Sequence, residues 1–228
     1  IADTVIQMVH WILWVGPLGV FALILPISAQ AGGSIIKALG IYIGMLCILY
    51  ISITGLLYGV ARIGKGEPLL RYAKAILPAQ VVAMSTHSSV ATLPAMVESA
   101  SNLGYPSRVT GLVLPLAVSL FRITGPVANL AVVLYSASLF GIELSLPQML
   151  TGAAIAVVMS LAAVGLPGQV SFFTSIVPIC VVMGVPVGAL PLLLAVETIP
   201  DIFRTIGNVT GDVAVTAVVA RHAGEGSP

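Results

Sequence analysis

The chain has 228 residues, of which 58% are hydrophobic and only 7% are charged, with a net charge of +1. Soluble domains carry about 25% charged residues, and a soluble core of this size cannot hide so much apolar surface. The composition therefore excludes a soluble protein and predicts an all-α membrane protein. The near-zero net charge gives no support to nucleic-acid binding. Two cysteines, Cys47 and Cys180, lie in apolar runs, so we interpret both as small buried hydrophobic residues.

The N-terminal region predicts two membrane-crossing helices. Apolar residues 4–28 are followed by a turn-like Ala-Gly-Gly-Ser at 31–34 and by the uncharged residues 38–61. Each apolar run exceeds the roughly 20 residues that a crossing helix needs, so we expect one helix within residues 1–33 and another over residues 34–63. The start has no basic flank or small-residue cleavage site, so we expect a fragment that lacks an N-terminal part rather than a signal peptide.

The next apolar region, residues 68–105, has a polar interruption in its middle. The sequence Ser-Thr-His-Ser-Ser at 85–89 is followed by Pro94, and the arm on each side has about 13 to 15 residues. Arms of this length are too short to cross alone, and non-helical backbone at membrane depth must be buried in protein or line a cavity. The pattern therefore predicts a re-entrant helical hairpin, which is followed by a long helix over residues 109–140.

A second interrupted region follows, because the uncharged residues 144–196 contain Gly-Leu-Pro-Gly at 165–168 and Gly-Val-Pro-Val-Gly at 184–188. We expect a second re-entrant hairpin over residues 145–187 and a final helix over residues 189–222. The order hairpin, helix, hairpin, helix indicates an inverted-repeat transporter, in which paired interrupted segments mark the binding site.

The basic residues give an independent test of this topology. With two re-entrant hairpins, six basic residues fall on one side of the membrane and only Lys37 falls on the other. The positive-inside rule makes the richer side cytoplasmic, which predicts a multi-pass protein of the cell (inner or plasma) membrane. The six residues are Arg62, Lys65, Arg71, Lys74, Arg108 and Arg221.

The final helix carries ionisable and amide side chains on one face. Their spacings of four, three, four and four residues place them within about 80° of one another, and ionisable groups inside a membrane helix usually line a site or pathway. The surplus of acids favours cations and the arginine favours a carboxylate. The alternative is a structural ion-pair ladder between helices. These residues are Glu197, Asp201, Arg204, Asn208 and Asp212.

The tips of the two hairpins are expected to complete this site. Short helices that end at mid-membrane point amide N–H groups at an anion, while unwound carbonyl groups can hold a sodium ion. For Ser88 and Ser89 in the first tip, the alternative is a hydroxyl bond to a carbonyl one turn away. We interpret His87 as a proton carrier, as a partner for Asp201 or, equally, as a structural histidine.

Residues 197–212 resemble the last helix of the glutamate/aspartate transporter family, the dicarboxylate/amino acid:cation symporters. The serine-rich tip that ends in Ala-Thr-Leu-Pro at 91–94 and the Gly-Leu-Pro-Gly at 165–168 resemble the same family. The likeness covers the chain as the C-terminal two-thirds of such a transporter. It implies an elevator transporter, usually a homotrimer, with residues 1–33 in the scaffold and residues 34–222 in the transport domain. It also implies no enzymatic activity and no cofactor, with sodium or protons as the coupling ion.

The resemblance implies roles for individual residues. Arg204 would pair with a side-chain carboxylate of the substrate and Asp201 with its amino group. The remaining substrate contacts, chiefly to the α-carboxylate, would come from Ser88, Ser89, Thr205 and Asn208. One sodium ion would be held by Ala117, Asn208 and Asp212. A second sodium ion would be held by Ser119, Ser160, Leu161 and Ala163, beneath an outer gate that contains Gly165, Pro167 and Gly168.

One departure from the family falls in the middle helix. The family usually carries Asn-Met-Asp-Gly-Thr there, with a sodium-ligating asparagine and aspartate, whereas residues 121–126 read Phe-Arg-Ile-Thr-Gly-Pro. An arginine inside the membrane needs a partner, and Asp212 is the obvious candidate. Our hypothesis is that the Arg122 guanidinium stands in for a bound cation, so that coupling uses fewer sodium ions, or protons instead. The alternatives are a changed substrate preference or a loss of transport.

Together these patterns predict a symporter that moves a small anionic solute across the lipid bilayer. Asp201 favours an acidic amino acid such as aspartate or glutamate, because a plain dicarboxylate has no ammonium group for it. A C4-dicarboxylate symporter of the same fold is the alternative. A hydrolase that uses Ser88 or Ser89 with His87 is disfavoured because the chain has no Gly-x-Ser-x-Gly. A channel-like or non-transporting subunit is a further alternative.

Overall fold

The computed structural model describes residues 2–162 and 168–225. Within these ranges the chain forms α-helices, one short 3₁₀ helix and connecting turns, with no β-strand. Three segments are long and apolar enough to cross a membrane, at Ile35–Gly64, Ser107–Leu139 and Thr198–Ala223. The all-α prediction is confirmed for the described residues.

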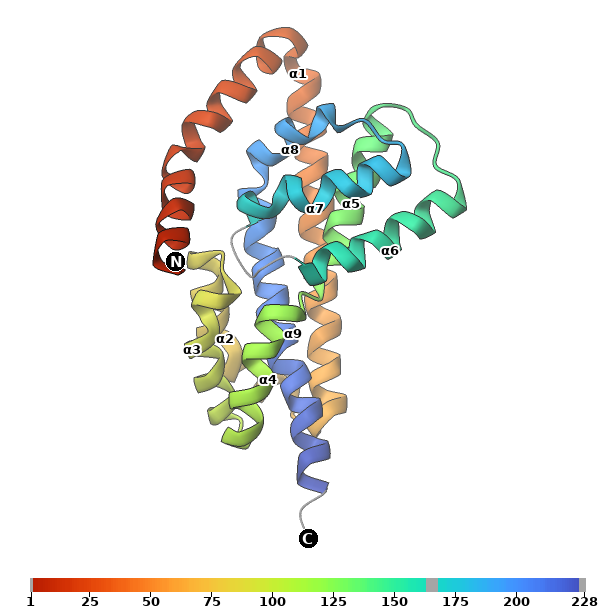
Figure 1. Cartoon of the computed structure of the whole chain (residues 1–228). Coiled ribbons are helices and arrows are strands. Elements are labelled where there is room, and N and C mark those ends of the chain that lie inside the picture. Colours follow the sequence, from red (N-terminus) through yellow and green to blue (C-terminus); the bar gives the residue numbers. More distant parts are fainter. Residues whose placement is uncertain (1, 163–167, 226–228) are drawn as a thin grey trace.

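Helix α1 spans Ala2–Lys65 and bends back on itself, so that its two arms run in opposite directions (Figure 1). The sequence predicted two helices with a turn at residues 31–34, but these residues are helical. An unpaired backbone group in lipid is costly, so a bent helix that keeps its hydrogen bonds is favoured over an open turn. Paired glycines, which are present here, are a common cause of such bends.

Helices α2 (Leu69–Thr86) and α3 (Ser89–Asn102) form a tight pair joined by His87 and Ser88. His87 ends α2 in the left-handed conformation, with φ of 52° and ψ of 23°. The Ser88 hydroxyl then accepts a hydrogen bond from an amide in the first turn of α3, which caps that helix. The pair occupies the range 68–105 that the sequence predicted for the first hairpin, with its tip at the polar cluster.

The middle membrane segment is divided into α4 (Ser107–Leu120) and α5 (Thr124–Leu139). The sequence predicted one helix over residues 109–140, whereas Phe121 leaves the helical region with φ of −101° and ψ of 66°. Two helices therefore stand where one was expected, and the break between them faces the middle of α9.

Pro126 lies in the first turn of α5, directly after the break. Because proline has no amide hydrogen, it cannot donate to the carbonyl four residues earlier, which belongs to Arg122. That carbonyl instead accepts from the Gly125 amide at 2.8 Å and from the Ser160 hydroxyl at 3.2 Å. The backbone group freed by the break is thus satisfied by α6, which contains Ser160.

The second interrupted region forms α6 (Leu146–Ala162) and α7 (Gly168–Met183), which pack against each other. The turn that the sequence predicted at residues 184–188 begins with Gly184 in the left-handed region, at φ of 71°. Only a residue without a Cβ adopts this conformation easily. The predicted tip of the second hairpin, at residues 165–168, lies largely outside the described residues, so a re-entrant hairpin over residues 145–187 stays a prediction.

The C-terminal part consists of the 3₁₀ helix η1 (Val187–Ala189), α8 (Leu190–Val196) and α9 (Thr198–Glu225). The final helix predicted over residues 189–222 is thus divided by a turn at Glu197. Helix α9 crosses the middle of the molecule and packs on α1, α2 and α4 (Figure 1). This central position brings most other helices into contact with α9.

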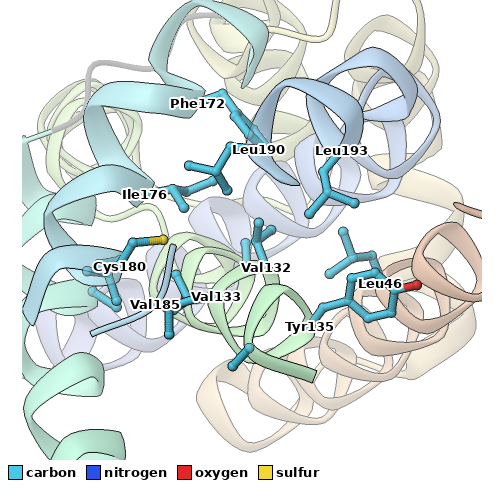
Figure 2. Packing of buried hydrophobic residues seen from close by; sticks show 14 of the residues in the cluster. Leu46, Val132, Val133, Tyr135, Phe172, Ile176, Cys180, Val185, Leu190 and Leu193 are labelled. Atoms are coloured by element: carbon cyan, nitrogen blue, oxygen red, sulfur yellow. The ribbon is translucent and has the colours of Figure 1, made fainter. Parts of the chain in front are cut away.

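Two apolar clusters hold the helices together. The first joins α1, α5, α7 and α8, and Figure 2 shows buried members such as Leu46, Val132 and Leu193. The second joins the end of α1 to α2, α3, α4 and α9. Large apolar side chains, among them Ile36 and Val181, are exposed on the outside, as expected for a surface that contacts lipid.

Candidate functional site

The polar face of α9 is buried. Four ionisable residues (Glu197, Asp201, Arg204 and Asp212) and the amide Asn208 each expose 4% or less of their surface. The helix can turn this face inward because it is surrounded by α1, α2 and α4. Burial of charged groups is costly unless they are paired, so the partners of these residues indicate what the site can do.

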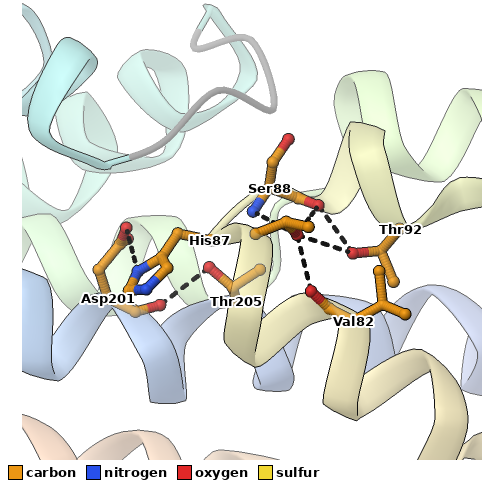
Figure 3. Close-up of polar contacts among 7 residues, drawn as sticks. Val82, His87, Ser88, Thr92, Asp201 and Thr205 are labelled. Atoms are coloured by element: carbon orange, nitrogen blue, oxygen red, sulfur yellow. Dashed lines mark hydrogen bonds and ion pairs between the residues drawn. The ribbon is translucent and has the colours of Figure 1, made fainter. Parts of the chain in front are cut away.

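The tip of the α2–α3 pair reaches α9 at Asp201, as Figure 3 shows. The Nδ1 atom of His87 lies 3.7 Å from Oδ2 of Asp201. On α9 itself, the Thr205 hydroxyl donates to the backbone carbonyl of Asp201 at 2.8 Å. The structure therefore brings His87 to Asp201, which is one of the three interpretations given to this histidine from the sequence.

The serines of the tip are part of the turn itself. The Ser88 hydroxyl oxygen accepts from the Ala91 amide at 3.3 Å, and the Thr92 hydroxyl donates to the Ser88 carbonyl at 2.8 Å. Ser89 is buried as the first residue of α3. These bonds fix the shape of the tip, so that α3 begins close to the polar face of α9 (Figure 3).

Asn208 is held by the break between α4 and α5. The amide and the hydroxyl of Thr124 both donate to Oδ1 of Asn208, at 3.1 and 2.8 Å. Gly207 permits this approach, because a Cβ there would lie 2.8 Å from Cγ2 of Thr124 and 3.1 Å from Oγ1 of Thr54. The sequence did not predict Thr124 as a site residue. The signal that points to Thr124 is its position within residues 121–126, where the sequence differs from that of the family it resembles.

The carboxylate of Asp212 interacts electrostatically with Arg122. Both side chains are buried, and Arg122 also interacts favourably with Asp201 and unfavourably with Arg204. Oδ1 of Asp212 has no hydrogen-bond partner among the described residues, which is costly for a buried carboxylate oxygen unless a cation compensates. In the same residues, no group of three His, Cys, Asp or Glu side chains could hold a metal ion.

Glu197 has a partner that sequence reasoning missed. The Tyr42 hydroxyl donates to Oε2 of Glu197 at 2.7 Å. The Tyr50 hydroxyl is buried without a hydrogen-bond partner in the described part of the chain, and it interacts electrostatically with the same glutamate. Tyr42, Leu46 and Tyr50 recur every four residues, so they share one face of α1. That spacing is the signal by which these tyrosines could be found.

A comparison of sequences identifies the family of this chain. Residues 1–222 match the sequence model of the Sodium:dicarboxylate symporter family. The chain belongs to this symporter family. The resemblance noted from the motifs is thereby confirmed.

Two kinds of symporter relative illustrate the match. The chain is 26% identical to the proton/sodium-glutamate symport protein of Bacillus subtilis over 230 aligned residues, which cover 100% of this chain and 53% of that protein. It is 31% identical to the C4-dicarboxylate transport protein of Cupriavidus necator over 219 residues, covering 94% of this chain and 49% of that protein. The chain thus spans about half the length of the curated relatives it matches.

The remaining cation ligands that the symporter resemblance implied lie at different places in the structure. The Ala117 carbonyl accepts an amide at the end of α4, whereas Ser119 is exposed and its hydroxyl donates to a carbonyl of the same helix. Leu161 is exposed. Ser160 is buried, and its hydroxyl donates to the carbonyl of Arg122. Ser160 therefore joins the break between α4 and α5, and the second sodium site stays a prediction.

Most residues of the predicted outer gate lie outside the described part of the chain. Gly165 and Pro167 of the gate lie outside the described residues, as does Ala163 of the second sodium site, and Gly168 is the first residue of α7. The gate therefore stays a prediction.

Proposed function

We propose that this chain is the substrate-binding part of a symporter that moves a small anion with carboxylate groups together with a cation. The observation that carries this proposal is the buried face of α9, where Arg204 lies between Asp201 and Asp212. A guanidinium recognises a carboxylate through paired hydrogen bonds. Nε of Arg204 is buried without a hydrogen-bond partner among the described residues, so a donor there is suited to a ligand.

The first candidate substrate is an acidic amino acid, in keeping with the glutamate symport proteins among the relatives. Arg204 would bind the side-chain carboxylate, and Asp201 would bind the ammonium group. The α-carboxylate would meet Asn208 and the start of α3. The supporting residues on the tip and on α9 would be Ser88, Ser89 and Thr205.

The second candidate is a C4-dicarboxylate, in keeping with the dicarboxylate transport proteins among the relatives. A specific contact favours it, because His87 lies 3.7 Å from the carboxylate that an ammonium group would need. A substrate with two carboxylates and no ammonium would leave this contact in place.

Asp212 would provide the cation-coupling end of the site, since its Oδ1 atom has no hydrogen-bond partner among the described residues. The coupling ion would be sodium or a proton. The positive charge of Arg122 interacts with Asp212, so we infer that it replaces part of the cation requirement. Ala117, Ser119 and Ser160 belong to this proposal as further oxygen ligands.

The arrangement in the membrane is part of the same proposal. Both helix pairs, α2–α3 and α6–α7, would be re-entrant hairpins related by an inverted repeat, and residues 165–168 would form the outer gate. Residues 1–33 would belong to the scaffold and residues 34–222 to a mobile transport domain of a homotrimeric elevator. Because the family consists of symporters, a transporter is favoured over an enzyme.

The proposal is tested by uptake in liposomes that contain the full-length protein. Labelled aspartate, glutamate and succinate are offered under an inward sodium gradient or an inward proton gradient. Accumulation of at least one of them that requires a cation gradient is expected. Equal uptake with and without a gradient would indicate a channel instead, and uptake of none of the three would contradict the proposed function.

A further inference from the structure

His87 occupies an unusual place at the tip of the α2–α3 pair. Among the described residues, it is the only one other than glycine with a positive φ, at 52°. The left-handed conformation is unfavourable for a residue with a Cβ, and glycine would adopt it more easily. Asparagine, aspartate and histidine adopt it more often than other residues with a Cβ, so this helix end can carry an imidazole at the tip.

The imidazole of His87 approaches a buried carboxylate. Its Nδ1 atom lies 3.7 Å from Oδ2 of Asp201, toward which the imidazole points (Figure 3). The Asp201 side chain is 1% exposed, whereas that of His87 is 22% exposed. A buried carboxylate requires a compensating charge or hydrogen bonds. The ammonium group of an acidic amino acid would need this same carboxylate, so His87 and the ammonium group compete for it.

We propose that His87 is the internal counter-ion of Asp201 and decides whether the site prefers a C4-dicarboxylate or an acidic amino acid. This inference rests on the proposed function. Protonated His87 neutralises Asp201 and repels a second positive charge, so a ligand without an ammonium group is preferred. With neutral His87, the ammonium group of an amino acid takes over the role of counter-ion, so the amino acid is preferred.

The other charged groups around Asp201 come from several helices. Arg204 and Arg122 are positive, and Glu197 is negative when ionised. Ionisable groups that interact with Asp201 include, besides His87, Glu197 and Arg204 near the start of α9, Arg122 between α4 and α5, and Tyr50 on α1. A proton on His87 would add one positive charge to this set of groups, 3.7 Å from the Asp201 carboxylate.

The direction of the pH effect follows from linkage. Proton binding to His87 favours the dicarboxylate, so low pH raises the affinity for dicarboxylate relative to amino acid. Coupling between two ligands is reciprocal, so dicarboxylate binding takes up protons and amino-acid binding releases them. This opposite sign is a signature that a purely structural histidine would not produce.

The test is competitive binding of fumarate and aspartate to the full-length protein in detergent, at constant sodium, at about pH 6 and about pH 8. Fumarate is chosen because both of its carboxyls stay ionised in this range. For the wild type, the ratio of the two affinities should shift toward aspartate at the higher pH by roughly fivefold, the effect of an ion pair worth about 1 kcal/mol. His87→Asn should bind aspartate preferentially at both pH values, since asparagine tolerates the left-handed conformation.

Two further variants sharpen this test. His87→Lys carries a charge at both pH values and should keep the preference for fumarate throughout. His222→Asn is the matched control, because this exposed histidine hydrogen-bonds within α9 and its loss should leave the ratio unchanged. In an Asp201→Asn background, His87→Asn should have no additional effect on the ratio, because the two residues act as one pair.

The outcomes separate this inference from the proposed function. If the wild type binds neither fumarate nor aspartate, both fail. If it binds either ligand but His87→Asn leaves the ratio and its pH dependence unchanged, the role of His87 is overturned and the proposed function stands. Should His87→Asn fail to fold, the proton uptake or release of the wild type on binding each ligand is measured in weak buffer. Proton exchange of the same sign with both ligands overturns the inference.

Discussion

The amide and the hydroxyl of Thr124 converge on the side-chain oxygen of Asn208, which lies 84 residues further along the chain. Thr124 is the first residue of α5, directly after the break from α4. Asn208 lies in the middle of α9 and is buried. The break in the middle segment is therefore tied directly to the polar face on which the proposed site depends.

Thr124→Val tests this connection. The variant keeps the shape and the amide but removes one of the two donors to Asn208, so we expect a loss of about 1–2 kcal/mol in the free energy of unfolding. Thermal unfolding in detergent measures the loss. Thr151→Val is the control, because the exposed Thr151 hydroxyl bonds only within its own helix. Equal unfolding temperatures for the two variants would contradict the importance of this bond.

Gly207→Ala tests the close approach of α9 to its neighbours. The new Cβ would lie 2.8 Å from Cγ2 of Thr124 and 3.1 Å from Oγ1 of Thr54, so we expect destabilisation by about 1–3 kcal/mol. Gly59→Ala, whose Cβ meets nothing within 4 Å, should instead be neutral or stabilising by about 0.5–1 kcal/mol. The same thermal measurement checks both, and a stable Gly207→Ala protein would show that the helices are less tightly packed.

Arg122→Met tests the tethered-cation hypothesis. Removal of the guanidinium leaves the buried Asp212 without its positive neighbour, so an external cation should be needed in its place. We expect substrate binding to depend more steeply on sodium concentration, measured by sodium titration with labelled aspartate or succinate. Arg62→Met, at the exposed end of α1, is the control. An unchanged sodium dependence in Arg122→Met would count against the hypothesis.

Tyr42→Phe tests the pair between α1 and the start of α9. The variant removes the donor to the buried carboxylate of Glu197, and leaving such an acceptor unsatisfied costs about 1–3 kcal/mol. Tyr135→Phe is a matched control, because the Tyr135 ring packs beside Tyr42 and its hydroxyl donates to the uncharged carbonyl of Ala38. We expect the smaller unfolding loss, about 0.5–1.5 kcal/mol, for the control. The reverse order would rule out a special role for the glutamate.

Local pattern was a good guide to some elements and a poor guide to others. The polar interruption at residues 85–89 correctly located the tip of the α2–α3 pair, because a cluster of short polar side chains ends a helix. The glycines at residues 31–34 suggested a turn, but the helix continues there, since lipid penalises unpaired backbone groups. The break near Phe121 went unrecognised, because a proline such as Pro126 does not by itself predict one: Pro115 lies inside α4 without ending that helix.

By itself, the sequence determined that this is an all-α protein of apolar surface and that α9 turns one polar face inward. Both follow from composition and from a spacing that repeats along a single helix. Only the tertiary structure decided which group each of these side chains meets: His87 for Asp201, Tyr42 for Glu197 and Thr124 for Asn208. These pairs join residues far apart in the chain, so they depend on how whole helices pack, which no local periodicity encodes.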